Sequence, residues 1–520
     1  MARQFPRAFY NYITMAGIGL ALFGLAAIII FWVMDTFLSE GSNPYLGIIM
    51  LVVLPGFLVA GLLLIPIGAI RQRRLRAAGR PRRVLTIDVE NSSHRRVLMT
   101  FGVGTAIFLL LTTMGMYSTF EFTESVQFCG EVCHHVMGPE LTAFLDSPHA
   151  GTHCVDCHVG SGAESYVKSK MSGTRQLWQV IKNDYAKPIQ VPIHPPLRSG
   201  EDICQSCHWP GKDQASTLHV FNHFLGDSAN TEWTLGMLFH VGGTSEGERH
   251  HAGGIHWHND PAAKMHYVAG DDELSRIIEV TWWKDGEPVV YTPRGIPLTE
   301  EERTEAEANH RGRDMDCITC HNRPAHNYKS PMLAVNEALA WETLDPKVPW
   351  IKREAVAALA SYYETNQGAR DSVGIRFREG LARRGVTVPD SSVMTIEALF
   401  ERNLFPDMKV RWVDYPDHRG HLFNAGCMRC HGSDLMTVEG EAISSDCETC
   451  HSVVLQGPPD QLENWNAPEG LKFVHPIEIA GGETILKCYE CHIGDESIYI
   501  NPEGLQNPEN QQSPPPNTPN

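Results

Sequence analysis

The chain has 520 residues, a formal net charge of −18 and 42% hydrophobic residues. This length predicts several structural units rather than one core. The excess of negative charge argues against a nucleic-acid partner, because the phosphates would be repelled. The longest apolar runs lie before residue 120, which excludes a chain that is soluble throughout.

Three apolar runs open the chain, and each is long enough to cross a bilayer. They cover Tyr12–Leu38, Tyr45–Ile70 and Val97–Phe120. The first run is too long for the apolar region of a cleaved signal peptide and has no clear A-x-A cleavage site, so it reads as a retained anchor. The sequence therefore predicts a three-helix transmembrane anchor over residues 1–120.

Arginine predicts the orientation of this anchor. Arg3 and Arg7 precede the first run, and nine arginines crowd residues 71–96 between the second and third runs. The loop between the first two runs has Asp35 and Glu40 and no basic residue. The positive-inside rule then makes 71–96 a cytoplasmic loop and places everything after the third run on the other side.

The charge divides at the same point. Residues 1–119 carry a balance of +7. Because the whole chain has a formal charge of −18, the remaining residues carry −25. An acidic outer part favours basic partners, whose docking would weaken with rising ionic strength.

All 14 cysteines stand in seven short motifs that each end in histidine. The first motif is a stretched C-x-x-x-C-H formed by Cys129, Cys133 and His134. The other six read C-x-x-C-H: Cys154/Cys157/His158, Cys204/Cys207/His208, Cys317/Cys320/His321, Cys427/Cys430/His431, Cys447/Cys450/His451 and Cys488/Cys491/His492. C-x-x-C-H attaches c-type haem through two thioethers and an axial imidazole. Zinc sites or disulfides give no reason for a histidine after every pair, so seven covalently bound haem c groups are predicted.

The motifs fall into a group of four and a group of three, separated by a stretch without cysteine or histidine. Apolar residues in that stretch recur at helical spacing, and Ile277–Tyr291 reads as a β-hairpin. The fold class is therefore mostly α with much irregular structure: three transmembrane helices plus an extracytoplasmic multihaem cytochrome c domain. The expected parts after the anchor are a tetrahaem domain with a β-hairpin insertion (121–329), a haem-free helical spacer (330–405), a trihaem domain (406–500) and a disordered tail (501–520).

Of the 25 histidines, 18 stand outside the motifs, and a low-spin haem needs a second axial ligand. His418, His421 and His475 are the candidates in the last block, three for three haems. Met137, four residues after Cys133, is a candidate for the first haem. The first block offers more candidates than it needs: His149, His326, His256, His258, His223 and His240.

Over roughly residues 97–327 the chain resembles the NapC/NirT family of membrane-anchored, quinol-oxidising cytochromes. The resemblance rests on CGEVCHHVMGPE, SPH, CVDCH, YVKSKMSGTRQLW, ICQSCHWP and CITCHNRPAH. The whole chain, with three spans and seven motifs, resembles the ImcH-type heptahaem inner-membrane cytochromes of metal-reducing bacteria. The resemblance implies Met137 as ligand of a first haem that faces a quinol pocket. It implies His326 for the second haem, His149 for the third, and His256 or His258 for the fourth.

Two departures from the family pattern concern the quinol pocket. The first motif has an extra residue, so His134, His135 or Met137 are all candidates for that iron. The family pairs a lysine after the second motif with a carboxylate about two helical turns later. Lys168 and Lys170 match the lysine, whereas Leu177 stands near the acidic position. The nearest substitutes are Glu164 and Asp184.

These features predict an inner-membrane, multi-pass cytochrome of bacteria whose haem domain is periplasmic. The expected function is oxidation of membrane quinol, with menaquinol the expected substrate, and relay of electrons to periplasmic c-type cytochromes or a reductase. The alternatives are a terminal multihaem reductase with one open haem, and an electron-transfer subunit of a larger respiratory complex or oligomer.

Overall fold

The computed structural model describes residues 11–38, 54–77, 90–132, 134–159, 163–189, 199–208, 216–242, 254–259, 263–432, 434–464, 470–477, 487–492 and 494. The predicted disordered tail, 501–520, lies outside the described residues. The chain forms two compact units. The first unit comprises Met1–Cys133 and His153–Asp184, and the second comprises His134–Thr152 and Tyr185–Asn520.

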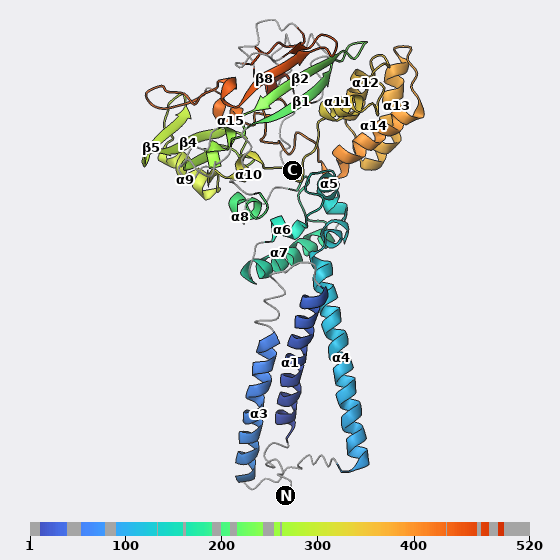
Figure 1. Ribbon diagram of the computed structural model, residues 1–520, viewed down its shortest axis with the longest axis vertical. Helices are drawn as coiled ribbons and strands as arrows, with labels where there is room; N and C mark the ends of the chain where they lie inside the picture. The colour runs from blue at the N-terminus through green and yellow to red at the C-terminus, as the bar shows by residue number, and fades with distance from the viewer. Residues whose placement is uncertain are drawn as a thin grey trace. The chain divides into compact units, whose positions relative to one another are not determined.

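Three long helices dominate the first unit (Figure 1): α1 (Tyr12–Leu38), α3 (Leu54–Ala77) and α4 (Ser92–Glu124). Each contains an apolar stretch long enough to cross a membrane. The helix α1 has the bounds expected from the sequence, and α4 runs further than expected at both ends. The expected loop 71–96 is shorter than predicted, because α3 continues to Ala77 and α4 starts at Ser92.

Small residues let α1 and α3 approach closely. A Cβ atom on Gly17 would lie 2.8 Å from the carbonyl oxygen of Gly61, so only glycine fits at this crossing. Close by, the Thr14 hydroxyl donates to the Ile65 carbonyl at 3.2 Å. Membrane helices associate through such small-residue contacts, because lipid offers no hydrophobic driving force between them.

The crossing gives a first prediction. Gly17→Ile forces a side chain against the α3 backbone, and we expect a loss of about 1–3 kcal/mol of stability. Gly19→Ile is the matched control, because no atom lies within 4 Å of a Cβ atom placed on Gly19. Thermal unfolding of the two variants in lipid nanodiscs measures the difference. Equal stability of the two variants would show that α1 and α3 do not meet at Gly17.

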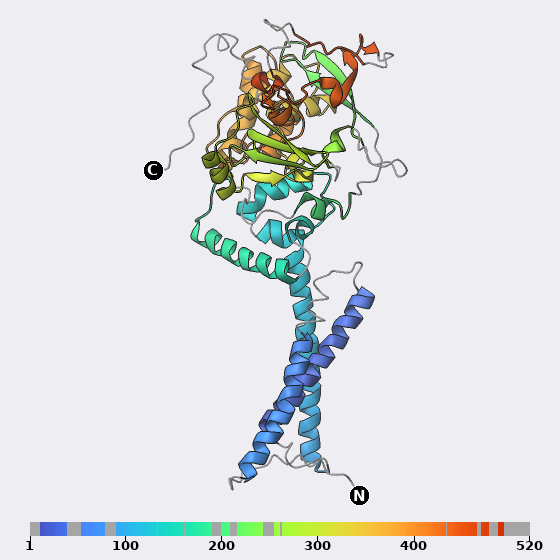
Figure 2. The same ribbon diagram turned by 90° about the vertical axis from the view of Figure 1, so that its left-hand side faces the viewer.

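Beyond the spans, the first unit holds the short π-helix η3 (Phe128–Val132), α6 (Cys154–His158) and α7 (Ala163–Lys182). Ser125 ends α4 and also starts the next turn, since its hydroxyl accepts from the Phe128 amide at 3.1 Å. Figure 2 shows α7 lying across the end of α4 rather than continuing along it.

The second unit contains a cluster of helices where the sequence periodicity predicts them. They are α11 (Pro331–Ala340), α12 (Ile351–Ala360), α13 (Asn366–Ala382) and α14 (Asp390–Asn403). Ser330 and Thr365 cap α11 and α13 with their hydroxyls. Leu339, Ile351 and Phe377 are fully buried in the shared core.

The second unit also contains more β-structure than we expected. A four-stranded sheet has the order β1-β2-β8-β9, and a five-stranded sheet has the order β6-β3-β4-β5-β7. Their strands are β1 (Thr217–Phe224), β2 (Glu232–Phe239), β3 (Met265–Ala269), β4 (Ile277–Lys284), β5 (Glu287–Pro293), β6 (Gly312–Asp314), β7 (Leu435–Met436), β8 (His451–Gly457) and β9 (Glu463–Asn464). The expectation of a mostly α fold is therefore corrected to a mixed one.

The expected hairpin is confirmed, because β4 and β5 pair antiparallel around a two-residue turn. Both turn residues, Asp285 and Gly286, have positive φ, which is the geometry that suits the twist of a hairpin.

Both sheets join segments that are far apart in sequence. Strand β2 pairs with β8, and β5 pairs with β7, so strands of the expected tetrahaem segment and of the expected trihaem segment share their hydrogen bonds. The division into 121–329, 330–405 and 406–500 stays a prediction. The first and the last of these three parts contribute strands to the same two sheets.

The remaining helices of the second unit are short. They are α5 (His134–Leu145), α8 (Gly200–Cys204), η4 (Ile255–Asn259), α9 (Glu300–Ala308), α10 (Cys317–Cys320), η5 (Pro406–Met408), α15 (Met428–His431), η6 (Cys447–Thr449) and α16 (Cys488–Cys491). Most of them carry part of a cysteine motif, so these motifs set the local structure of the unit.

Candidate functional site

A helical turn organises most of the described motifs. In α10, Asp316 caps the turn by accepting from the amides of Ile318 and Thr319, and Cys317 and Cys320 follow three residues apart. Side chains at i and i+3 of a helix lie on one face. The local structure therefore directs both thiols of a motif to the same side, as attachment of one porphyrin requires.

Cys157 and Cys207, each the second cysteine of its motif, differ in their exposure. Cys157 lies within α6 and is half-buried. Cys207 is exposed and lies beyond α8, which ends at Cys204, so this motif departs from the helical pattern. The Cys207 amide still donates to the Cys204 carbonyl at 3.1 Å, which keeps the two cysteines on one turn. Haem attachment at Cys157 and at Cys207 stays a prediction.

The stretched first motif has a different turn. Residues Phe128–Val132 form a π-helix, whose wider turn accommodates one extra residue between Cys129 and the next cysteine. Cys133 lies outside the described residues, as do the side chains of His134 and His135. Met137 is half-buried on α5.

The first two motifs lie side by side in the first unit. The Cys129 and Cys154 thiols are hydrogen-bonded, and this contact raises the pKa of Cys129 and lowers that of Cys154 to about 7. Glu124 and Lys170 also act on the pKa of Cys129, Glu124 raising it and Lys170 lowering it. These two charges are therefore close to the first attachment site.

The other five motifs form a series in the second unit. The Cys204 thiol is hydrogen-bonded to Cys317 and lowers its pKa to about 7. Gly200 permits this approach, because a Cβ atom there would lie 3.0 Å from the Cys317 Cβ atom. The series continues through charge effects between further cysteines, because Cys427 helps to raise the pKa of Cys320 and of Cys450, and Cys447 helps to raise that of Cys488. Motifs that are consecutive in sequence are thus neighbours in space.

Each described proximal histidine of this series faces a second histidine. The ring centroids are 6.0 Å apart for His149/His208, 6.5 Å for His256/His321, 5.9 Å for His258/His431, 6.1 Å for His421/His451 and 6.0 Å for His475/His492. A metal–imidazole bond is about 2 Å long, so an iron held between two opposed imidazoles leaves their centroids about 6 Å apart. The five pairs therefore fit haem c in their spacing and in their chemistry.

Hydrogen bonds orient several of these rings. The Nδ1 atoms of His258 and His431 lie 2.7 Å from the carbonyl oxygens of Ile255 and Ser444. His149 Nδ1 makes the same contact with Pro324 at 3.1 Å. A ring that donates from Nδ1 keeps its Nε2 lone pair for a metal, and such contacts to carbonyls are typical of metal-bound histidine.

The pairing differs from the sequence expectations at His418. We expected His418 to serve the last block, but the structure places His258 opposite His431 instead. His418 is buried, and its Nδ1 lies 3.3 Å from the Thr319 carbonyl. Burial lowers its pKa to about 3, so the ring is neutral at pH 7.

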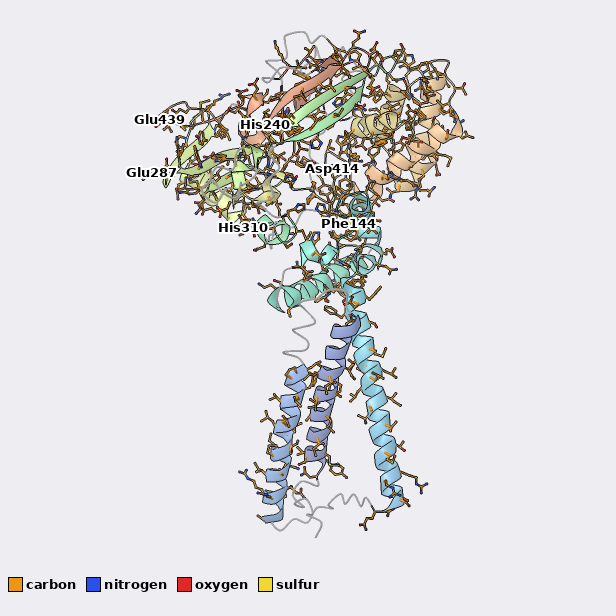
Figure 3. All side chains as sticks on the ribbon, in the orientation of Figure 1. Phe144, His240, Glu287, His310, Asp414 and Glu439 are labelled. Carbon is orange, nitrogen blue, oxygen red and sulfur yellow. The ribbon has the colours of Figure 1, made fainter. Side chains whose placement is uncertain are left out.

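Two other candidates for the fourth haem lie elsewhere. His223 lies near Lys352 and His492, which both help burial to lower its pKa to about 4. His240, labelled in Figure 3, binds the Ser452 hydroxyl at 3.1 Å where β2 meets β8. His326, expected at the second haem, has its Nδ1 3.1 Å from the Glu140 carbonyl.

The expected quinol residues are brought together only in part. Lys170 on α7 forms an ion pair with Glu124, the last residue of α4, a carboxylate that we did not expect. Asp184 and Lys168 are exposed, and the side chain of Glu164 lies outside the described residues.

Glu124 is the residue that the sequence reasoning missed. It is 5% exposed, and its Oε2 atom has no hydrogen-bond partner among the described residues. A carboxylate at the end of an apolar span is costly unless it is paired, and such residues tend to be functional. That position in the sequence was the available signal.

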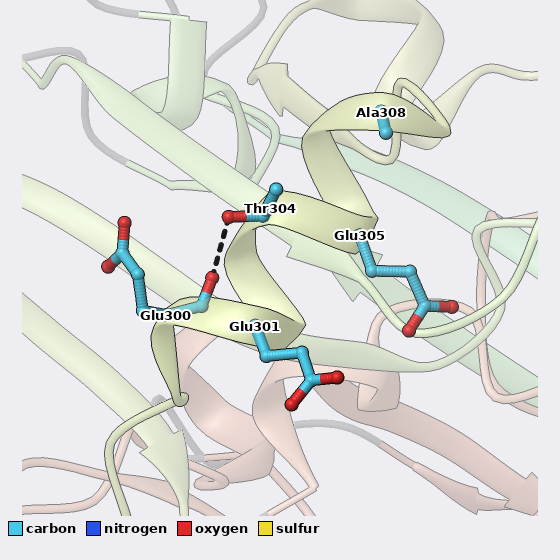
Figure 4. Close-up of a pocket in the computed structure, with 5 residues that line it drawn as sticks. All are labelled: Glu300, Glu301, Thr304, Glu305 and Ala308. Atoms are coloured by element: carbon cyan, nitrogen blue, oxygen red, sulfur yellow. Dashed lines mark hydrogen bonds between the residues drawn. The ribbon is translucent and has the colours of Figure 1, made fainter.

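One shallow surface depression among the described residues is unrelated to the motifs (Figure 4). It lies on α9 and is lined by Glu300, Glu301, Thr304, Glu305 and Ala308. The Thr304 hydroxyl donates to the Glu300 carbonyl at 2.8 Å, an ordinary helix contact. A solvated acidic helix surface is sufficient to explain it.

Helical cysteine turns, opposed histidines and apolar spans together define a membrane-anchored c-type cytochrome of electron transport. The model of the NapC/NirT cytochrome c family, N-terminal region, matches residues 91–193. The cytochrome c-type protein ImcH of Geobacter sulfurreducens is 38% identical over 95% of this chain and 97% of its own length. The chain therefore belongs to the ImcH family of c-type cytochromes, with covalently bound haem c. No solved structure matches the chain.

The imidazole pairs give a second prediction. Removing His258 would leave the haem of the Cys427/Cys430/His431 motif with an open axial position, and we expect a high-spin signal from one haem in His258→Ala. Electron paramagnetic resonance of the oxidised protein measures it.

His418→Asn is the matched control. Every haem that is low-spin in the parent protein should stay low-spin in this variant. Haem content by the pyridine haemochrome assay shows that both variants are fully loaded. The opposite result, a new high-spin signal in His418→Asn alone, would restore His418 as the ligand.

Proposed function

We propose that this protein is an inner-membrane cytochrome with seven haem c groups that oxidises membrane quinol and passes the electrons to periplasmic acceptors. Menaquinol is the expected quinol, and a soluble periplasmic c-type cytochrome or a reductase is the expected acceptor. The Arg-rich segment 71–96 supports a cytoplasmic side opposite to the motifs.

The 14 cysteines, the half-buried Cys157 and the exposed Cys207 included, would hold the porphyrins, and the histidine that ends each motif would be the proximal ligand. The opposed rings support His149, His256, His258, His421 and His475 as the second ligands of the last five haems. For the first two haems we keep Met137 and His326 as the proposed ligands. Haem c, when bound, supplies one-electron redox chemistry at each of these positions.

One observation carries the quinol proposal. The ion pair of the buried Glu124 and the half-buried Lys170 stands where α4 ends, beside Cys129 of the first motif. A quinol headgroup reaches this level from the bilayer, because the apolar stretch of α4 ends at Glu124 itself. The pair thus joins the end of the span to the first attachment site.

The chemistry of quinol oxidation fits this pair. Conversion of one quinol to quinone releases two electrons and two protons, so a proton acceptor is needed beside the electron acceptor. Glu124 offers an oxygen, Oε2, without a partner among the described residues. Lys170 binds the other oxygen and so holds the carboxylate in place.

The rival reading, a terminal reductase, needs one iron with an open position. In the series of the second unit, each of the five described proximal rings has a second histidine within 6.5 Å. This arrangement supports electron transfer rather than substrate reduction at those positions.

A third prediction tests the quinol site. Glu124→Gln removes the proton acceptor but keeps the size of the side chain, and we expect the rate of reduction by a menaquinol analogue to fall by about 100-fold or more. Lys170→Gln should lower the rate on the order of tenfold, and the double variant should be no slower than Glu124→Gln alone, because the two residues act as one unit.

The matched controls are Glu121→Gln, an exposed acid on the same helix, and Lys168→Gln, an exposed lysine on α7. Both should react with quinol like the parent protein. Dithionite reduces every variant if the haems are intact. A parent protein that dithionite reduces but quinol never does would disprove the proposed function.

A further inference from the structure

Helix α7 presents an apolar surface that no described residue covers. Met171 is 71% exposed, Trp178 58% and Ile181 67%. These residues recur at spacings of seven and three, so they share one face of the helix together with Val167. We call these four residues the α7 apolar face. Large apolar side chains gathered in this way normally mark a binding surface.

Basic residues border the α7 apolar face. Arg175 and Lys182 are exposed on its flank, and Lys168 lies on the same side of the helix. The Lys182 amine lies 5.0 Å from the Trp178 ring centre, so its chain runs along the indole. An apolar stripe with tryptophan and a basic border is the pattern of a helix that lies in the plane of a membrane interface.

The position of α7 in the first unit supports the same partner. Lys170, on the edge of the α7 apolar face away from the basic flank, is bound to Glu124. Glu124 is also the last residue of the apolar stretch of α4. The ion pair therefore fixes α7 at the level where a membrane span ends and the lipid headgroups begin (Figure 2).

We propose that α7 is an interfacial helix that inserts the α7 apolar face into the outer lipid leaflet and binds anionic headgroups through its basic border. The charge complementarity and the tie to the end of α4 favour lipid over a second protein. This binding holds Lys170 at a constant depth. The inference does not depend on whether the protein oxidises quinol.

Photocrosslinking of the full haem-loaded chain in lipid nanodiscs tests the proposal. A photoreactive phenylalanine analogue is placed at Met171, at Trp178 or at Gln176, which is exposed on the opposite side of the helix. Mass spectrometry then measures lipid adducts. We expect on the order of tenfold more adduct at 171 and 178 than at 176. The same analogue at Ile107, an exposed residue of the α4 span, is the positive control.

The basic border is tested with charge-removing variants in the same assay. Arg175→Gln and Lys182→Gln should each lower the adduct at 178 by about fivefold in phosphatidylglycerol. Neither should change it in phosphatidylcholine. Equal adduct at 176 and 178, or adducts at 178 to protein only, would overturn the proposal. The readout needs no quinol, so the result is separate from that of the quinol assay.

Discussion

The arrangement of the second unit fits one constraint of the proposed ligation: each iron of a bis-histidine haem needs two imidazoles on opposite sides. A motif supplies only one of them, so the second must come from another part of the chain. His149 reaches His208 across more than fifty residues, and His258 reaches His431 across far more. The sheets serve this requirement, since the pairing of β2 with β8 and of β5 with β7 connects the segments that the histidines also connect.

A different constraint acts on the first unit: burying a charged group at the edge of a membrane costs free energy. Glu124 ends an apolar helix and is buried, which is tolerable because Lys170 neutralises it. The partner sits on α7, so the charge requirement also determines where that helix lies. Cys129 and Cys154 meet in the same region, and the ion pair is therefore part of the surroundings of the first attachment site.

Local patterns in the sequence were good guides to local structure. The Asp285-Gly286 pair predicts the β4–β5 hairpin, and helical periodicity predicts α11 to α14. What local patterns do not contain is the pairing of distant segments. His258 was one of two candidates for the fourth haem, whereas its ring lies opposite His431 of the fifth motif. Glu124 was missed because its partner was sought within a few turns of Lys170, and the pair joins two helices instead.

The turn η4 carries His256 and His258 two residues apart, and their rings face two different motifs. Under the proposed ligation, five residues of backbone belong to two haem positions at once. An insertion or deletion on either side of this turn would shift both proposed ligands together. The turn η4 therefore couples the fourth motif, the last of the first group, to the fifth motif, the first of the second group.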